Sequence, residues 1–248
     1  MPSLATVPTQ AYSTSIAHDA AQVRAAQRLR TAVFGDELGA ALPGALDSTQ
    51  FDTDEFDAVC DHLIVTHEPT GEVVGTYRLL PPGRTRSLYS AGEFDVSALA
   101  PLRGSLIEAG RSCVHPDHRG GSVINLMWSA LARYMLLSGH RYLAGCASVP
   151  LADGGRAAIS TWRLAESRHA APANYRVQPH QPWSGPSHAE RPSYAHVPPL
   201  LRGYLRLGAW VCGPPAHDEA FGVADFFVLL RLDHLDERYL RYFLGDAR

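Results

Sequence analysis

The sequence predicts a mixed α+β fold in which a mostly antiparallel sheet is flanked by helices. Strand-like and helix-like segments are interleaved without the regular strand–helix alternation of a parallel sheet. Two strand-like runs, 62–67 and 72–80, are joined by a turn signal, which predicts a hairpin. With 46% apolar and 19% charged residues, the 248-residue chain can form a large core. One domain is therefore expected over 18–248, after a flexible tail at 1–17.

The first helix is expected over 18–34, because apolar residues from Val23 to Val33 recur at helical spacing. Arg30 falls on the same face, so its charge should point inward and need a partner. A loop is expected at 39–50. In the hairpin that follows, Gly75 indicates a bulge or a close approach of another segment.

The rest of the chain continues the mixture of strands and helices. Further strands are expected at 105–115, 142–149, 209–213 and 223–232, and further helices at 122–137, 153–169, 198–207 and 234–243. The helix from Ser122 is apolar nearly all round, so it should pack deep against a sheet and end at Gly139. A proline-rich insertion is expected near 150–199, and its part 170–197 should lie over the site.

Composition excludes several classes of protein. The net charge of -3 excludes a strongly basic nucleic-acid binder. All 22 basic residues are arginine, which excludes a lysine-containing phosphate loop, a lysine Schiff base and a serine–lysine dyad. No long apolar run and no leader-like segment is present, and the four cysteines form no CxxC pair, so a cytoplasmic protein is expected. His115 and His118 beside Cys113 offer too few ligands, so no metal is expected.

One signal of function is a set of charged residues among apolar neighbours. Three arginines and three carboxylates balance in sign: Arg30, Arg78, Arg111, Asp54, Asp57 and Glu108. They predict either a structural ion-pair cluster or a polar pocket that binds a charged substrate and tunes a general base. The residues by themselves leave both interpretations open.

A second signal is the loop Arg119-Gly120-Gly121-Ser122, which joins a strand to the apolar helix. Glycines allow close approach of a ligand to the backbone, and the free amides at the start of a helix favour an anion. Arg119 would add a charge-assisted contact to a phosphate. A simple turn is the alternative.

Read in order, several of these segments resemble a known family. They are Arg30-x-x-Val33-Phe34, Asp52-x-Asp54-Glu55-Phe56-Asp57, His62-Leu-Ile-Val65, Gly75-Thr-Tyr-Arg78-Leu79, Glu93-Phe94 and Glu108-Ala-Gly-Arg111-Ser-Cys-Val-His-Pro-Asp-His-Arg119. This pattern resembles the acyl-homoserine-lactone synthases and their relatives in the GCN5-related N-acyltransferase (GNAT) superfamily. The later segments 142–149, 198–208 and 221–230 are similar to the L-ornithine Nα-acyltransferases of ornithine-lipid synthesis.

The resemblance implies a three-layer fold with a bent sheet whose strands 105–115 and 142–149 splay apart, and an N-acyltransferase activity. A long acyl group, often 3-hydroxylated, would move from the phosphopantetheine thioester of acyl carrier protein to the α-amine of an amino acid, with ornithine as the expected acceptor. The usual glycine pattern for the coenzyme A pyrophosphate, Q/R-x-x-G-x-G/A, is incomplete in the segment Arg119-Gly120-Gly121-Ser122-Val123-Ile124. A carrier-protein donor is therefore expected in preference to acyl-CoA, with no tightly bound cofactor.

The resemblance also assigns roles to residues. Glu108 would be the general base, and Arg111 would keep its carboxylate ionised, which needs a bulge near Gly110 because positions 108 and 111 of a regular strand face opposite ways. The acceptor would be bound by Arg30, Phe34, Asp54, Asp57, Arg78, Phe94 and Ser148. The donor would be bound by the backbone of Cys113, Val114 and His115 and by Arg119, Gly120, Gly121 and Ser122.

Three other functions remain open at this point. They are an autoinducer-type synthase that lactonises its product, an acetyl-CoA-dependent N-acetyltransferase, and a non-catalytic acyl-binding module. The expected partners are acyl carrier protein and an amino acid, without nucleic acid, and peripheral contact with the inner face of the membrane stays compatible with the sequence.

Overall fold

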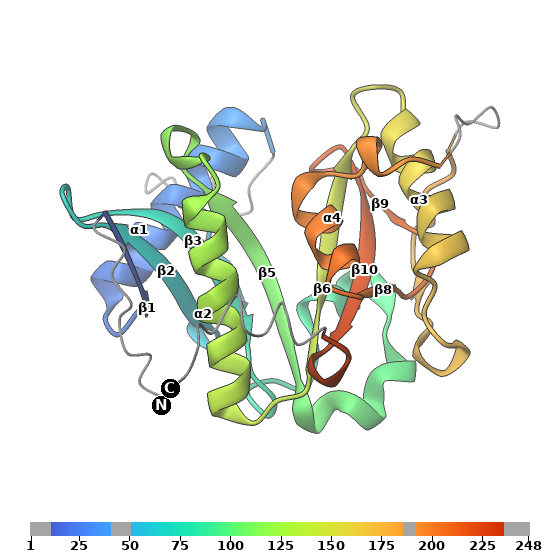
Figure 1. Cartoon of the computed structure of the whole chain (residues 1–248), viewed down its shortest axis with the longest axis horizontal. Helices are drawn as coiled ribbons and strands as arrows, with labels where there is room; N and C mark the ends of the chain where they lie inside the picture. Colours follow the sequence, from blue (N-terminus) through green and yellow to red (C-terminus); the bar gives the residue numbers. More distant parts are fainter. Residues whose placement is uncertain (1–10, 41–50, 186–191, 236–248) are drawn as a thin grey trace. The chain divides into compact units, whose positions relative to one another are not determined.

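The structure, a computed structural model, describes residues 11–40, 51–185 and 192–235 (Figure 1). By their contacts these residues divide into two compact units. Unit 1 draws on residues up to 84 and on 109–140, and unit 2 draws on 85–108 and on residues from 141 onward. Both are discontinuous and they share one strand, so a single domain over 18–248 remains a prediction.

Unit 1 contains the strand order β1-β2-β3-β5, with antiparallel pairing of the first three strands. Its elements are β1 (Tyr12–Ile16), β2 (Asp61–His67), β3 (Glu72–Leu80), the second part of β5 (Leu106–Val114), α1 (Ala20–Arg30), a π-helix (Thr31–Glu37), η2 (Glu55–Ala58), η5 (Pro116–His118) and α2 (Ser122–Ser138). β3 is buried from Val74 to Leu80, which means that both of its faces are covered. Both α1 and α2 contact β3.

The side chains of β3 alternate between one face of the sheet that contacts α2 and the other face, which contacts α1. Gly75 faces α2: a β-carbon there would lie 2.8 Å from Cγ1 of Val123. The neighbouring position Thr76 and the alternate position Arg78 point the other way, toward α1. The pairing with β2 shifts register between Val65 and Thr66, opposite Gly75. The expected bulge and the expected close approach are both confirmed.

Unit 2 is built around β6 (Tyr142–Pro150) and β10 (Val223–Arg231), which pair antiparallel along their whole length. The first part of β5 joins β6 in parallel, through Leu106–Glu108 and Tyr142–Ala144. The remaining elements are η3 (Tyr89–Gly92), β4 (Phe94–Asp95), η4 (Ser97–Ser105), α3 (Arg156–Arg168), η6 (Ala173–Tyr175), β7 (Gln178–Pro179), η7 (Tyr194–His196), α4 (Pro199–Arg206), β8 (Trp210–Val211), β9 (Ala216–Asp218) and η8 (Leu232–His234).

The predicted fold class is confirmed, since helices flank a mixed sheet: β1 with β2, β2 with β3 and β6 with β10 pair antiparallel, and β5 with β6 pairs parallel. The expected tail is wrong for residues 12–16, because this segment forms β1 and pairs with β2. Its sequence, Tyr-Ser-Thr-Ser-Ile, is largely polar and lacks the pattern of a half-buried strand, and Thr14 is its one buried residue. Residues 41–50 of the expected loop and most of the expected helix 234–243 lie outside the described residues.

The proline-rich insertion is tied to unit 2 in its described part. The amide of Val177 donates to the carbonyl of Cys212, and β7 pairs with β4. The ring of Tyr175 stacks on Trp210 with centroids 5.9 Å apart. Within the described ranges, no helix is both long enough and apolar enough to cross a membrane.

Candidate active site

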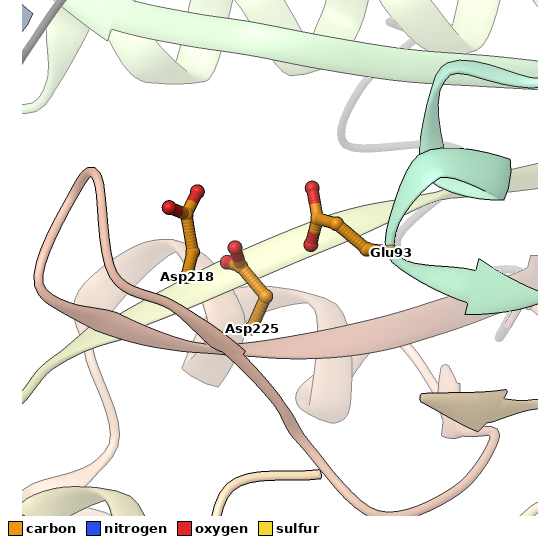
Figure 2. Close-up of side chains that lie close together, drawn as sticks. All are labelled: Glu93, Asp218 and Asp225. Carbon is orange, nitrogen blue, oxygen red and sulfur yellow. The ribbon is translucent and has the colours of Figure 1, made fainter. Parts of the chain in front are cut away.

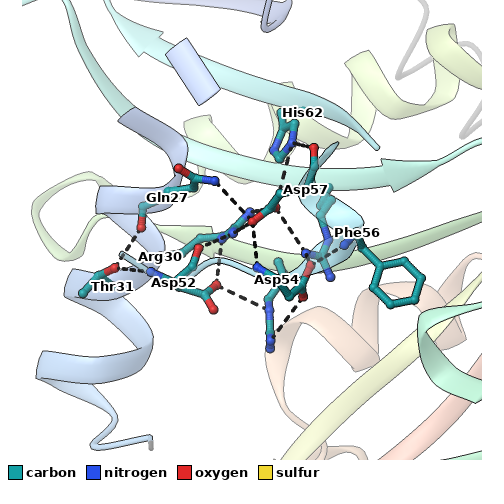
Figure 3. A network of polar contacts seen from close by, with 10 residues as sticks. Gln27, Arg30, Thr31, Asp52, Asp54, Phe56, Asp57 and His62 are labelled. Carbon is teal, nitrogen blue, oxygen red and sulfur yellow. Dashed lines mark hydrogen bonds and ion pairs between the residues drawn. The ribbon is translucent and has the colours of Figure 1, made fainter. Parts of the chain in front are cut away.

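A buried ion-pair network lies in unit 1 between α1 and the acidic segment, residues 52–57 (Figure 3). Arg30 ends α1 on its inward face and is fully buried. Its Nε donates to Oδ2 of Asp52 over 2.7 Å. Its Nη1 and Nη2 donate to the two carboxylate oxygens of Asp57 over 2.9 and 2.8 Å. The sequence prediction that Arg30 points inward and needs a partner is confirmed.

A second arginine, Arg78, belongs to the same network. Nη1 of Arg78 donates to Oδ1 of Asp54 over 2.6 Å and to Oδ1 of Asp57 over 3.2 Å. The acidic segment builds its own scaffold: Asp54 caps η2, and the Asp54 amide donates back to Asp57. The local backbone of this segment therefore helps to orient the two carboxylates toward the arginines.

The arginines control how this segment ionises. Burial by itself would raise the pKa of Asp57, but Arg30 and Arg78 outweigh it and lower that pKa to about 2. Nε2 of His62 lies 3.1 Å from the carbonyl oxygen of Asp57, and burial lowers the pKa of this imidazole. Asp57 is thus an anion at neutral pH.

Arg111 joins the same network from β5. Its Nε lies 3.4 Å from Oδ2 of Asp52, and its Nη2 lies 3.8 Å from Oδ2 of Asp54. Its φ of 53° is in the left-handed region, which costs free energy in a residue other than glycine. The irregularity expected near Gly110 is therefore at Arg111 itself.

Glu108, the predicted base, is buried at the point where β5 pairs with β6 in unit 2. Its carboxylate accepts hydrogen bonds from the amides of Tyr89, over 2.5 Å, and Ser90, over 2.9 Å. Burial raises the pKa of Glu108, while Ser90, Tyr89 and Arg103 lower it. Within unit 2, the groups that favour its ionised form are the Ser90 side chain, these two amides and Arg103, and the role expected for Arg111 remains a prediction.

The predicted phosphate loop leads into α2, which begins at Ser122. A β-carbon at Gly120 or Gly121 would meet no atom within 4 Å, and Gly121 has a φ of 97° that favours glycine. Arg119 forms an ion pair with Glu37. Its Nη1 donates to Oε1 of Glu37 over 2.6 Å, and its Nη2 donates to Oε2 over 2.7 Å. The open backbone at Gly120 and Gly121 fits an anion. A phosphate would compete with the Glu37 carboxylate for Arg119.

The three neighbouring donor-site positions have partners within unit 1. The amide of His115 donates to the carbonyl of Val74 over 2.8 Å, so this amide is already used by β3. The carbonyl of Val114 accepts from Nε of Arg119 over 3.0 Å. The Cys113 side chain is buried, and burial raises the pKa of its thiol to about 12, so it is no nucleophile. A backbone contact to the donor at these positions remains a prediction.

Three predicted acceptor residues take different places. Phe34 packs beside Cys113 in unit 1. Phe94 is 1% exposed and packs edge-on against Phe227, so in this structure it belongs to the core of unit 2. The hydroxyl of Ser148 donates to Oδ1 of Asp225 over 2.6 Å. Their binding roles remain predictions.

Unit 2 also holds a group of carboxylates that the sequence analysis did not single out (Figure 2). One oxygen each of Glu93, Asp218 and Asp225 lies within 4.8 Å of the others. Glu93 follows η3, Asp218 ends β9 and Asp225 lies in β10. Carboxylate oxygens in this arrangement can bind a cation, metallic or organic.

Some of the missed residues carried a signal. Asp225 is a lone charge in the apolar run Val223–Leu230, the same criterion that identified Glu108. Asp52 was part of the acidic stretch, but nothing in the spacing indicated that it bridges Arg30 and Arg111. Asp218 and Glu37 stand in polar surroundings and gave no signal.

Comparison with known proteins adds independent findings. A family profile described as acetyltransferase (GNAT) domain matches residues 29–129. An L-ornithine Nα-acyltransferase of Brucella abortus (strain 2308) is 34% identical over 94% of this chain and 88% of its own length. A protein of the same name from Rhodobacter capsulatus is 36% identical over 94% of each chain.

The fold has matches among solved structures. The structure of a CoA-dependent acyl-homoserine lactone synthase, BjaI, with SAM and isopentyl-CoA, matches with a TM-score of 0.54 and 17% identity. The match covers 92% of this chain and 85% of that one. At this identity the likeness concerns the fold.

Proposed function

The chain belongs to the L-ornithine Nα-acyltransferases, which makes it an N-acyltransferase, and we propose that it transfers a long 3-hydroxyacyl group from acyl carrier protein to the α-amine of ornithine. The product would be the monoacylated precursor of an ornithine lipid. The observation that carries the proposal is the buried carboxylate of Glu108, placed by two amides and raised in pKa.

A carboxylate with a raised pKa is suited to take a proton from an ammonium group. In the proposed reaction the α-ammonium group of the acceptor gives a proton to Glu108, directly or through water. The neutral nitrogen then attacks the thioester carbonyl carbon, and a carbon–nitrogen bond forms. When the tetrahedral intermediate collapses, the carbon–sulfur bond breaks, the nitrogen loses its extra proton to the leaving sulfur, and pantetheine leaves as the thiol, while Glu108 returns its proton to water. The amide nitrogen keeps the acyl group.

The amides of Tyr89 and Ser90 position the carboxylate of Glu108. Both come from the first residues of η3, so two backbone amides hold the base, in addition to the Ser90 side chain. Holding amine and thioester in one orientation is a large part of the rate effect in transfers of this kind. Precise placement of Glu108 therefore serves catalysis twice, as base and as guide for the amine.

The start of α2 supports a donor with one phosphate. Gly120 and Gly121 leave the backbone open, and Arg119 stands beside them. Counted from Arg119, Ser122 and Ile124 stand where the coenzyme A pattern has glycine and glycine or alanine, so this helix start lacks the small residues of a pyrophosphate site. This supports the phosphopantetheine of acyl carrier protein as donor over coenzyme A.

Expression in a bacterial host without aminolipids tests the proposal in cells. Mass spectrometry of the lipid extract should show an N-acylated ornithine that is absent from the host and from cells carrying the Glu108→Gln variant. An N-acyl-homoserine lactone, an N-acetylated amino acid or no new product would contradict it.

A further inference from the structure

We propose that Glu37 determines donor specificity: its carboxylate admits the single phosphate of a carrier-protein phosphopantetheine and disfavours the pyrophosphate of coenzyme A. This inference rests on the proposed function, because it assigns a further residue to the same donor site. Glu37 and Arg119 both belong to unit 1, and their ion pair is the observation that carries the inference.

The guanidinium of Arg119 has one bidentate edge left for an oxyanion, and Glu37 occupies it. A guanidinium offers five N–H groups in one plane, and it binds a carboxylate or a phosphate through two parallel N–H groups. The edge that includes Nε is engaged, because Nε donates to the carbonyl of Val114 over 3.0 Å. The other edge donates from Nη1 and Nη2 to the two oxygens of Glu37. A phosphate can therefore bind Arg119 bidentately only by displacing Glu37.

The backbone that carries Glu37 keeps this carboxylate close to Arg119 after displacement. Glu37 is the last residue of the π-helix. The amide of the next residue, Leu38, donates to the carbonyl of Val33 over 3.1 Å, which is the i→i−5 hydrogen bond of such a helix. The hydrogen bond from Arg119 lowers the pKa of Glu37, and the ordinary glutamate pKa also lies well below 7. Paired or displaced, Glu37 is an anion at neutral pH.

The start of α2 can balance the charge of one phosphate. Gly121 caps this helix without a side chain that accepts from its first amides, and the first turn of α2, which the structure describes in full, contains no acidic residue. These amides act as about half a positive charge. Together with Arg119 they nearly offset the displaced Glu37 and a single phosphodiester. A pyrophosphate brings a second negative charge to the same place, and its repulsion from Glu37 is correspondingly larger.

This arrangement gives specificity by penalising the wrong donor, and not by adding a contact to the right one. The penalty increases with the charge of the donor. The side chains of Glu37 and Arg119 are 35% and 43% exposed, so solvent screens each charge interaction and keeps it modest. We therefore expect changes of several-fold for each donor charge.

The test compares donors that carry the same long 3-hydroxyacyl group and differ in phosphate. They are acyl-pantetheine, which has no phosphate, acyl-ACP, which has one, and acyl-dephospho-CoA, which has a pyrophosphate; L-ornithine is the acceptor throughout. Glu37→Gln should increase kcat/KM for acyl-dephospho-CoA by about 10-fold, mainly through a lower KM, and for acyl-ACP by about 3-fold or less. For acyl-pantetheine it should stay within about 2-fold of the wild type.

Two further variants separate charge from shape. Glu37→Asp retains the negative charge on a shorter side chain, so it should retain the preference of the wild type for acyl-ACP over acyl-dephospho-CoA. Asp36→Asn is the matched control. It removes the neighbouring exposed carboxylate of the same π-helix and should leave that preference unchanged.

Two results would overturn the inference while leaving the proposed function intact. One is an equal change for all donors in Glu37→Gln, which would give the ion pair a structural role alone. The other is a preference for acyl-ACP that stays the same or increases in this variant.

Failure of the proposed function is a different result, namely a wild type that acylates ornithine from none of these donors. Calorimetry with holo-ACP and dephospho-CoA would then still decide the role of Glu37, because Glu37→Gln should strengthen binding of dephospho-CoA more than binding of holo-ACP. Equal changes in the two affinities would contradict the inference.

Discussion

The carboxylate of Glu108 accepts a hydrogen bond of 2.9 Å from the backbone amide of Ser90. Because the donor is a backbone amide, it remains in place when the Glu108 side chain is substituted. A Glu108 variant therefore tests the carboxylate alone. Glu108→Gln retains the shape and one acceptor oxygen. We expect kcat to fall by about 10²- to 10⁴-fold with an unchanged circular dichroism spectrum. A variant that retains more than half of the wild-type kcat would exclude Glu108 as the base.

The raised pKa of Glu108 gives the reaction a defined pH dependence. Glu108 must be a carboxylate to accept a proton, so kcat/KM should increase as the pH rises through its pKa. Since burial raises that pKa, this limb should lie above about 4.3, the ordinary glutamate value. The limb should vanish in Glu108→Gln, while the limb due to the amine of the substrate remains. A wild-type profile that lacks the glutamate limb would contradict the assignment.

The pair between Arg30 and Asp57 should stabilise unit 1. Asp57→Asn leaves Arg30 and Arg78 with an unbalanced buried charge, so we expect the free energy of unfolding to fall by about 3–5 kcal/mol. Urea denaturation measures this. Asp233→Asn, which breaks an exposed pair with Arg231, should change stability by about 0.5 kcal/mol or less. Equal effects of the two substitutions would show that the network is no more than surface charge.

The same pair predicts how stability depends on acid. The pKa of Asp57 is lowered to about 2 from the usual 3.8, so its contribution is fully present above about pH 4. That contribution should be lost as the pH falls from about 4 to about 2. Wild type and Asp57→Asn should therefore converge in stability across this range, and a difference between them that stays constant down to about pH 2 would contradict the assignment.

Arg119 should act on donor binding. Arg119→Ala should raise the KM for acyl-ACP more than it lowers kcat, because a phosphate contact is similar in the ground state and the transition state. Glu37→Gln is the matched control, since it removes the ion pair but keeps Arg119. Its KM for the donor should equal or fall below that of the wild type. A raised KM in both variants would mean that the ion pair itself is what matters.

Much of the fold could be predicted from local patterns. The hairpin, the apolar helix that ends at Gly139 and the bulge opposite Gly75 each depend on residues close in sequence. β1 could not be predicted, because a polar strand is stabilised by pairing with β2, a long-range contact. The left-handed Arg111 was also hidden, since this conformation depends on its surroundings and not on its residue type.

The site could be predicted only where charge stood out against apolar neighbours. Arg30, Arg78 and Asp57 were identified in this way, and their pairing is confirmed. The amides that hold Glu108 could not be predicted, because a backbone amide carries no signature in a sequence. Carboxylates on separate segments, such as Glu93 and Asp218, meet only after folding.

A competition assay with purified protein tests the central claim most directly. L-ornithine is supplied with equal concentrations of a long-chain 3-hydroxyacyl-ACP and acetyl-CoA, and the products are quantified by mass spectrometry. We predict that Nα-(3-hydroxyacyl)ornithine is the main product and that Glu108→Gln forms very little of it. Acetylornithine formed at an equal or higher rate would contradict the claim.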